Sequence, residues 1–353
     1  MILSRRLLIT MLLVLVGLVL AGITFGPVDI SVNSILKLIA HKFGWNVFSL
    51  EGLAWNTSAT QFRPWMENII VDVRVPRVLV GALAGACLAI SGAVMQGMFR
   101  NPLASPSILG VSSGASLGAI LALYLGFASI SVWILPSFAF IGAGLTLWLV
   151  YRIASQRGKT AIGTLLLSGV AIGALNTALS SLILALSLSN WEVGRMIVYW
   201  TMGGLDGRTW DHFWLLLPFA SFGICAVMFF AKSLDALLLG ETHAVSIGVD
   251  VLRTRRYLLL ITALMVGATV AVCGSIGFVG LVVPHILRLA MGPHHRFLLP
   301  ASALGGAITL VAADLFLRTV FSEKAIPLGV ATASLGAPFF IFLLVKKRWS
   351  IQL

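Results

Sequence analysis

The residues that could bind a nucleotide give the first test of what this sequence can do. The tripeptide Gly158-Lys159-Thr160 matches the end of a phosphate-binding loop. The full motif requires a glycine five positions before Gly158, because the backbone of the loop must wrap closely around the phosphates. Ile153 occupies that position, and apolar runs lie on both sides of the fragment. The fragment is therefore not a nucleotide site, and any ATP hydrolysis must occur on another chain.

Acids, histidines and cysteines that could couple transport to ions or hold a metal are sparse. Only Asp314 lies deep within an apolar run, whereas ion-coupled transporters favour buried acids. His285 and the pair His294-His295 have no acidic or cysteine partners nearby, so no metal site is predicted. The three cysteines lie inside apolar runs and are interpreted as small buried side chains. The chain offers no nucleophile, acid pair or metal cluster for an enzyme.

Two arginines flank a proline in the segment Arg74-Val75-Pro76-Arg77, where an apolar run begins. Arginine at this point can extend its charged group to lipid phosphates. Alternatively, the pair can dock an acidic surface, because a guanidinium binds a carboxylate through two parallel hydrogen bonds. The spacing alone leaves both interpretations open.

Small and polar residues mark two further segments. The stretch from Gln96 to Pro106 holds two prolines and Asn101, which break the chain between two predicted helices, and a face of small residues follows. The later apolar run 161–188 carries Gly169 and Gly173, which permit close helix contact, and then Asn176 and Thr177. The residue types on this face fit two interpretations equally well: the face packs against a partner helix, or it lines a transport pathway. No ring of carboxylates accompanies it, which argues against an ion channel.

The segment from Leu234 to Arg256 is polar and ordered in pattern. Gly240-Glu241 and Gly248 divide it into short amphipathic stretches, which predicts short helices separated by glycine turns. A passive loop does not need such a pattern. We therefore interpret the segment as a platform for a soluble partner.

Composition indicates the solvent that surrounds these motifs. Of 353 residues, 59% are hydrophobic and only 10% are charged, against roughly a quarter charged in soluble domains. Lipid is therefore the expected surrounding. The net charge of +12 is distributed over short gaps between apolar runs, which excludes a continuous basic face for nucleic acid and fits topology determinants instead.

Apolar runs of spanning length predict an all-α membrane protein with ten transmembrane helices in a single domain, 1–353. The predicted spans are 7–26, 76–98, 108–127, 130–151, 161–188, 212–231, 257–275, 277–291, 298–318 and 328–345. The eighth is short and interrupted by Gly277 and Gly280, which suggests a partial span.

Lys and Arg in the short loops predict that both termini face the cytoplasm of a bacterial inner membrane. With this orientation, 27–75 is the one sizeable outer loop, and 232–256 is the longest cytoplasmic loop. Residues 31–43 within the outer loop have the apolar pattern of a helix lying at the membrane surface.

Taken together, these segments resemble the FecCD family of importer permeases, which handle iron–siderophores, haem and cobalamin. The resemblance runs through nearly the whole chain from Arg74 onward, and the 40–66 insertion matches no motif of the family. The matching stretches are RVPR at 74–77, SGAVMQGMFRNPLASPSILGVSSGA at 91–115, LLLSGVAIG at 165–173, YWTMGG at 199–204, LGETHAVSIGV at 239–249, GFVGLVVPHILRL at 277–289, AADLFLR at 312–318 and IPLGVATASLGAPFF at 326–340.

The resemblance implies the fold of a type II ABC importer permease that pairs with a second permease subunit, either an identical or a related chain. Two cytoplasmic ATPase subunits, which bind ATP and magnesium, and a periplasmic substrate-binding protein are the further partners it implies. No cofactor is expected on this chain. A ferric siderophore is the expected cargo, with haem or cobalamin as the alternative.

The resemblance also assigns roles to residues by motif position. Arg74, Arg77 and Arg318 are expected to meet acidic residues of the binding protein. Gly240, Glu241 and Gly248 are expected to receive the ATPase. Asn101 and Leu103 are assigned to the inner gate, and the helix that holds Gly169, Gly173, Asn176 and Thr177 to the pathway. An ion-coupled secondary transporter is the alternative from a different class.

Overall fold

A computed structural model describes most of the chain, namely residues 2–28, 30, 64–156, 159–160, 162–322, 324 and 326–350. The predicted surface helix at 31–43 and nearly all of the 40–66 insertion lie outside the described residues.

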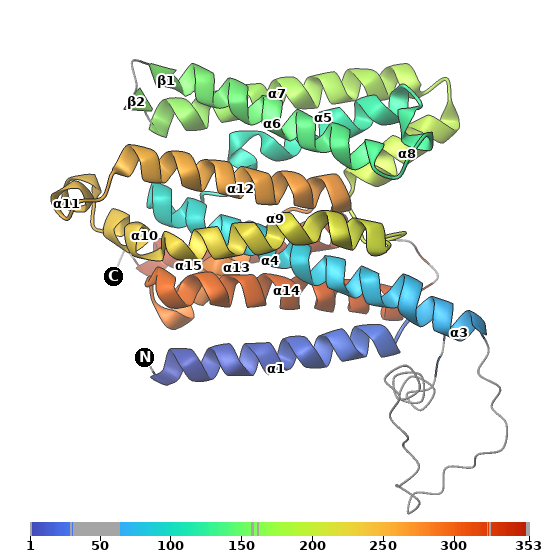
Figure 1. Ribbon diagram of the computed structural model, residues 1–353, viewed down its shortest axis with the longest axis horizontal. Helices are drawn as coiled ribbons and strands as arrows, with labels where there is room; N and C mark the ends of the chain where they lie inside the picture. Colours follow the sequence, from blue (N-terminus) through green and yellow to red (C-terminus); the bar gives the residue numbers. More distant parts are fainter. Residues whose placement is uncertain are drawn as a thin grey trace, which may run out of the picture.

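Each of the ten predicted spans contains an α-helix in the structure (Figure 1), and the all-α prediction is confirmed. Within the described residues, seven helices are long and apolar enough to cross a membrane, and α5, α13 and the segment Leu328–Phe342 of α15 are shorter apolar helices. The ten are α1 (Ile2–Thr24), α4 (Val75–Phe99), α5 (Val111–Tyr124), α6 (Ile134–Ala154), α7 (Ile162–Ser187), α9 (Trp210–Phe229), α12 (Val251–Cys273), α13 (Val279–Met291), α14 (His295–Val320) and α15 (Leu328–Ser350).

Shorter elements connect these helices at their two ends. They are α3 (Pro64–Asn68), the π-helix η1 (Ile69–Arg74), the 3₁₀ helices η2 (Pro106–Leu109) and η3 (Phe127–Ser129), α8 (Trp191–Thr201), α10 (Ala231–Leu238) and α11 (Glu241–Ser246). The strands β1 (Ser155–Gln156) and β2 (Lys159–Thr160) pair antiparallel.

The long helices lie roughly side by side, so the molecule has two distinct ends (Figure 1). One end carries α10 and α11 and is called the α11 end. The other carries α3 and α8 and is called the α8 end. The helix α1 begins and α15 ends at the α11 end, as expected for an even number of spans.

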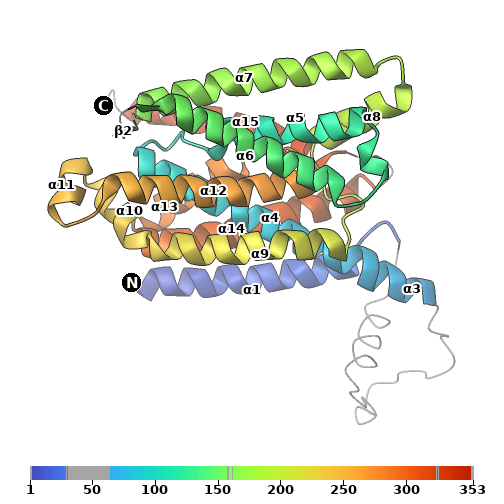
Figure 2. The same ribbon diagram turned by 45° about the horizontal axis from the view of Figure 1, so that its top comes forward.

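The helices are arranged around α4 and α12. Figures 1 and 2 both place α5, α6 and α7 together on one side of these two helices and α1 on the opposite side, against α14. The α4–α14 crossing is a direct backbone contact, because a Cβ added at Gly85 would lie 2.1 Å from the carbonyl oxygen of Gly306. Small residues at this crossing therefore bring the two backbones together.

The start of one span differs from the sequence prediction, and the prediction of a partial span agrees with the structure. The helix predicted to begin at Pro76 continues a helical segment from Pro64 through α3 and the π-helical turn η1. Proline is tolerated here because it stands in the first turn of α4, where the wider turn of η1 precedes it. The predicted partial span is confirmed: α13 has only 13 residues and begins after Phe278, whose φ is +65°.

Candidate functional site

A network of charges at the α8 end joins α4, α14 and the loop before α9. The guanidinium of Arg77 donates to both oxygens of Asp314, with Nη2 2.7 Å from Oδ1 and Nε 3.1 Å from Oδ2. Its Nη1 donates to Oδ1 of Asp206 at 2.7 Å. The Asp314 side chain is 4% exposed and that of Asp206 is 68% exposed. The one acid predicted deep within a span is therefore neutralised by an arginine, as a buried carboxylate requires.

The two remaining arginines of the predicted docking set bind the end of α1. Arg318 forms a second ion pair with Asp314, at 3.3 Å, and its Nη2 donates to the carbonyl oxygen of Gly22. Arg74 donates to the carbonyl oxygens of Ile23 and Thr24 at 3.1 and 2.5 Å. These are the carbonyls that the last turn of a helix leaves without intrahelical partners, and a cation is favourable there.

Arg74 and Arg318 are consequently buried, and their guanidiniums contact this chain. The Arg77 side chain keeps 18% of its surface exposed. The predicted docking of a binding protein by the three arginines stays a prediction. The structure adds a second role for the same residues, which is to hold α1 and Asp314 in place.

The predicted gate segment is a tight turn at the α11 end. Arg100 ends α4 with a φ of +50°, and Oδ1 of Asn101 accepts a hydrogen bond from the backbone N–H of Leu103 at 2.9 Å. This side-chain turn explains why asparagine suits the position. Leu103 is exposed, and η2 follows directly.

Some residues on the polar face of α7 pack against neighbouring elements, and others are exposed. A Cβ added at Gly169 would lie 2.3 Å from the carbonyl oxygen of Ile108, so α7 packs directly on η2, just beyond the gate turn. Asn176 is buried and donates to Oγ1 of Thr146 on α6 at 2.9 Å. Gly173 approaches Gly110 in the same contact. Thr177 bonds within its own helix and is exposed, whereas Gly173 is half-buried and Gly169 and Asn176 are buried.

The predicted platform has the expected local structure. It consists of α10 and α11 with glycine turns, since Gly240 has a φ of +117° and Gly248 a φ of +85°. A residue with a side chain is strained at such angles. Large apolar side chains on the platform are exposed, namely Leu239, Val245 and Ile247. Where such side chains form a contiguous patch, they are typical of contact surfaces.

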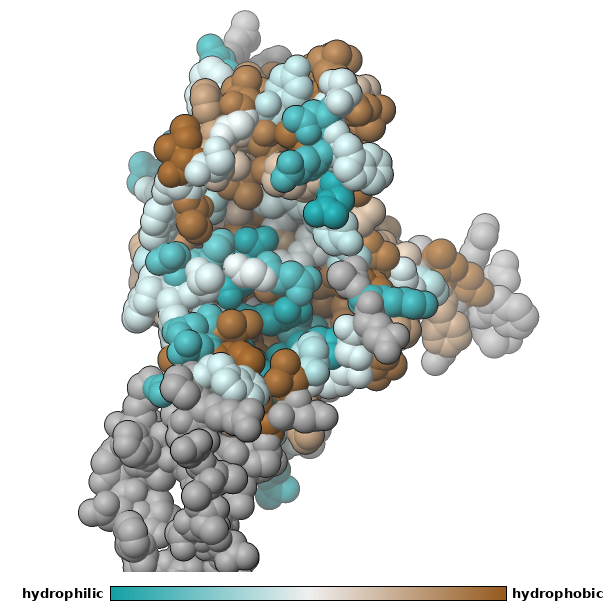
Figure 3. All heavy atoms as spheres, turned by 90° about the vertical axis from the view of Figure 1, so that its right-hand side faces the viewer, coloured by the Kyte–Doolittle hydropathy of each residue, from teal (hydrophilic) through white to brown (hydrophobic). Residues whose placement is uncertain are grey.

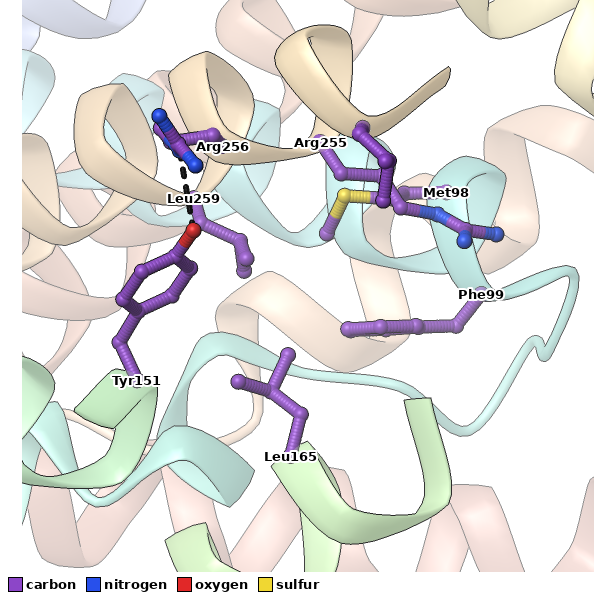
Figure 4. Close-up of a pocket in the computed structure, with 8 residues that line it drawn as sticks. Met98, Phe99, Tyr151, Leu165, Arg255, Arg256 and Leu259 are labelled. Carbon is purple, nitrogen blue, oxygen red and sulfur yellow. Dashed lines mark hydrogen bonds between the residues drawn. The ribbon is translucent and has the colours of Figure 1, made fainter. Parts of the chain in front are cut away.

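Two consecutive arginines of α12 connect the platform with the rest of the molecule. Nη2 of Arg255 donates to Oε1 of Glu241 at 2.6 Å, and Nε of Arg256 donates to the hydroxyl of Tyr151 on α6 at 2.9 Å. Figure 4 shows the two arginines pointing to opposite sides of a small pocket that is also lined by Met98. The hydrogen bond from Arg255 lowers the pKa of the Glu241 carboxyl below its ordinary value.

A third contact holds the platform against the start of α14. Oδ1 of Asp235 on α10 accepts a hydrogen bond at 2.8 Å from the backbone N–H of His295. The same oxygen lies 2.8 Å from Nδ1 of the His295 ring. Burial alone raises the pKa of the Asp235 carboxyl, but the hydrogen bonds from His295 outweigh it and lower the pKa below its ordinary value.

Sequence reasoning missed several of these contributors. No contact was predicted for Asp206, Arg255 or Tyr151. Their partners are 14 to 129 residues away in sequence, so the local pattern does not reveal them. No group of three or more His, Cys, Asp or Glu side chains within the described part of the chain is placed to hold a metal ion.

The chain is similar to known transport proteins over almost its whole length. The model of the FecCD transport family matches residues 10–346. The chain is 45% identical over 282 residues to the cobalamin import system permease protein BtuC of Halobacterium salinarum, covering 80% of this chain and 74% of that protein. It is 42% identical to the vitamin B12 import system permease protein BtuC of Citrobacter koseri, covering 84% and 89%.

A solved structure agrees with these matches. It is described as an inward-facing conformation of a metal-chelate type ABC transporter, and it superposes with a TM-score of 0.82 at 30% sequence identity. The superposition covers 97% of this chain and 99% of that chain.

Proposed function

The chain belongs to the FecCD transport family and is a multi-pass membrane permease of an ABC importer, and we propose that its cargo is cobalamin. The observation that carries this choice is the 42–45% identity to permeases named for cobalamin or vitamin B12 import, over at least 80% of this chain. The ferric siderophore expected from the sequence alone becomes the second candidate. The similarity to a metal-chelate type transporter at 30% identity supports it.

We further propose the orientation and the partners. The α11 end faces the cytoplasm, so both termini are cytoplasmic, because Arg100, Arg152, Lys232, Arg253 and Arg296 lie at this end. Two ATPase subunits, which bind ATP and magnesium, dock on α10 and α11 through the exposed apolar side chains between Leu239 and Ile247. A second permease subunit completes the membrane unit.

The substrate-binding protein docks at the α8 end in this proposal. Arg77 is the member of the predicted docking set that keeps exposed surface, and the exposed carboxylate of Asp206 lies beside it. Arg74 and Arg318 support this surface by fixing the end of α1. Acidic residues of the binding protein would then bind close to an arginine that is already held in place.

The mechanism we propose is alternating access, in which the platform transmits ATPase movement to the spans. Displacement of α11 pulls on Arg255 through Glu241 and so moves the start of α12. The next residue, Arg256, carries the movement to Tyr151 and α6. The gate turn at Asn101 follows α4, whose last turn contributes Met98 and Phe99 to the same pocket (Figure 4). No bond of the cargo is made or broken.

Uptake by intact cells tests the cargo. Cells that express the chain with its binding protein and ATPase are supplied either with cobalt-labelled cyanocobalamin or with an iron-labelled siderophore. We expect accumulation of the corrinoid, and its loss when the chain is deleted. Accumulation of iron alone would replace cobalamin by the second candidate.

A further inference from the structure

The start of α14 is held by a buried polar contact that the connection through Glu241 does not use. Hydrophilic residues gather in the middle of the open face at the α8 end (Figure 3), whereas at the α11 end the side chain of His295 is completely buried. Its partner is Asp235 on α10, whose side chain is 32% exposed. The pair therefore joins the surface of the platform to the interior of the helix bundle.

Asp235 fixes both the beginning of α14 and the orientation of the histidine ring. The side chain of His294, which precedes the helix, makes no capping hydrogen bond, so the first N–H of α14 needs an acceptor from elsewhere. Oδ1 of Asp235 accepts this N–H of His295 at 2.8 Å and also lies 2.8 Å from Nδ1 of the ring. Because a carboxylate can only accept, Nδ1 carries a proton and donates it. One oxygen atom of α10 thus holds the backbone and the ring of His295.

The opposite edge of the ring lies against the last turn of α4. A Cβ added at Gly97 would lie 2.3 Å from Nε2 and 2.8 Å from Cε1 of His295, so only glycine fits beside the ring. Nε2 has no hydrogen-bond partner in the described part of the chain, and the contact with Gly97 is therefore one of packing. Since packed groups transmit displacement, a movement of α10 reaches α4 through this single side chain.

The stretch of α4 that the ring touches also holds the gate turn. The backbone N–H of Arg100 donates to the carbonyl oxygen of Gly97 at 3.3 Å, and that of Asn101 donates to the carbonyl oxygen of Gln96 at 3.2 Å. The platform approaches the same turn from its other part, because a Cβ added at Gly240 would lie 3.7 Å from Nη1 of Arg100. The first two residues of the turn are therefore held by residues in contact with, or next to, the histidine ring.

We propose that His295 is a positioning residue for the inner gate, whose ring passes the displacement of α10 to Gly97 and so to the turn that holds Asn101 and Leu103. The proposal rests on the proposed function, since it requires the ATPase to dock on the platform and the gate to lie in this turn. The connection through Glu241 leads to α12 and α6, whereas this one reaches the end of α4 directly. A histidine that only packed the core would stabilise the protein without affecting the movement of the gate.

Thiol labelling of the gate tests this proposal without any cargo. The parent chain carries Leu103→Cys as reporter and Cys225→Ser, so that its remaining native thiols, Cys87 and Cys273, are buried. The purified permease–ATPase complex is treated with a maleimide, once without nucleotide and once trapped with ATP and vanadate, and the label on this chain is measured. We expect the labelling rate of the parent to differ between the two states. His295→Asn keeps a donor for Asp235 but withdraws the ring from Gly97, and it should lose most of this difference.

Variants of Gly97 separate the proposed role from a general loss of structure. Gly97→Ala places a methyl group against the ring and should also diminish the nucleotide response. When it is combined with His295→Asn, the methyl group occupies space that the ring has left, so part of the response should return. His294→Asn, at the adjacent exposed histidine, and Gly144→Ala, where nothing lies within 4 Å of the added atom, are the controls and should respond like the parent.

The possible outcomes distinguish this inference from the proposed function. An equal nucleotide response in the parent and in His295→Asn would overturn the role of His295 and leave the gate and the ATPase docking intact. A double variant that responds no better than either single one would contradict the contact with Gly97. If His295→Asn does not assemble, Asp235→Ala decides, because it removes the acceptor at a partly exposed position, and an unchanged response there would contradict the connection to α10. A parent that does not respond to nucleotide would reject the gate assignment and this inference together.

Discussion

Nη2 of Arg255 lies 2.6 Å from Oε1 of Glu241, and this pair links the short helix α11 with the long helix α12. The arginine side chain is mostly buried, whereas the glutamate is about half exposed. Since the adjacent Arg256 bonds Tyr151, a movement of α11 reaches two of the spanning helices through neighbouring residues. The pair is therefore the point at which coupling can be interrupted without disturbing the core.

Glu241→Gln should weaken this coupling. The substitution keeps the shape of the side chain but removes the charge from a partly exposed pair, which is worth about 0.2–1 kcal/mol. We expect an assembled complex whose transport falls up to about fivefold at a given rate of ATP hydrolysis. Asp250→Asn is the control, because it removes an exposed pair with Arg253 outside this connection. Equal losses in both variants would argue against a special role for Glu241.

Arg77→Met should destabilise the protein by roughly 3 kcal/mol or more, because it removes the principal partner of the buried Asp314. Thermal unfolding in detergent measures the loss. The double variant Arg77→Met/Asp314→Asn leaves no unpaired buried carboxylate, so much of the stability should return. A double variant as unstable as the single one would show that the ion pair is not the cause.

The same double variant also separates the two roles of Arg77. If the arginine docks the binding protein, the stable double variant should bind that protein several-fold more weakly than the wild type. Arg195→Met, an exposed arginine of the same end, serves as control. Undiminished binding of the binding protein would remove Arg77 from the docking set and leave it a purely structural residue.

Gly85→Ala should disrupt the α4–α14 crossing. The new Cβ would meet the carbonyl carbon and oxygen of Gly306 at 2.6 and 2.1 Å, and neither backbone can yield easily. We expect a loss of about 1–3 kcal/mol or failure to assemble. Gly144→Ala is the matched control, since nothing lies within 4 Å of the added atom. Its thermal unfolding should match that of the wild type.

The pKa of Asp235 predicts a pH dependence. Because that pKa is lowered in the folded protein, its contribution to stability is fully present above the ordinary carboxyl value of about 4 and is lost as the pH falls through the folded pKa. Asp235→Asn should therefore be less stable than the wild type at neutral pH, and the difference should shrink below about pH 4. A difference that stays constant down to acid pH would contradict the assigned pairing with His295.

The spans could be predicted from the sequence because a bilayer imposes a length and an apolar composition on each helix. The short helices of the platform could also be predicted, because Gly240 and Gly248 mark the turns between them in the local sequence. By contrast, α8 was not predicted, because its 11 residues include Glu192 and Arg195 and do not form an apolar run of spanning length.

The contacts of the charged residues could not be predicted, because they depend on how distant helices pack. The segment 74–77 suggested two arginines directed at lipid or at a partner. Within this chain, Arg74 contacts the end of α1 and Arg77 contacts Asp314, 237 residues away in sequence, and neither contact could be read from the segment itself.

ATP-driven uptake in a purified system is the most direct test of the central claim that this chain is the permease of an ABC importer. The chain is reconstituted with its ATPase into vesicles that contain ATP and magnesium but no ion gradient, and binding protein loaded with labelled cyanocobalamin is added outside. We predict that label accumulates inside, and that accumulation stops when the ATPase is omitted or ATP is replaced by a non-hydrolysable analogue. Uptake that needs an ion gradient and proceeds without the ATPase would contradict the account.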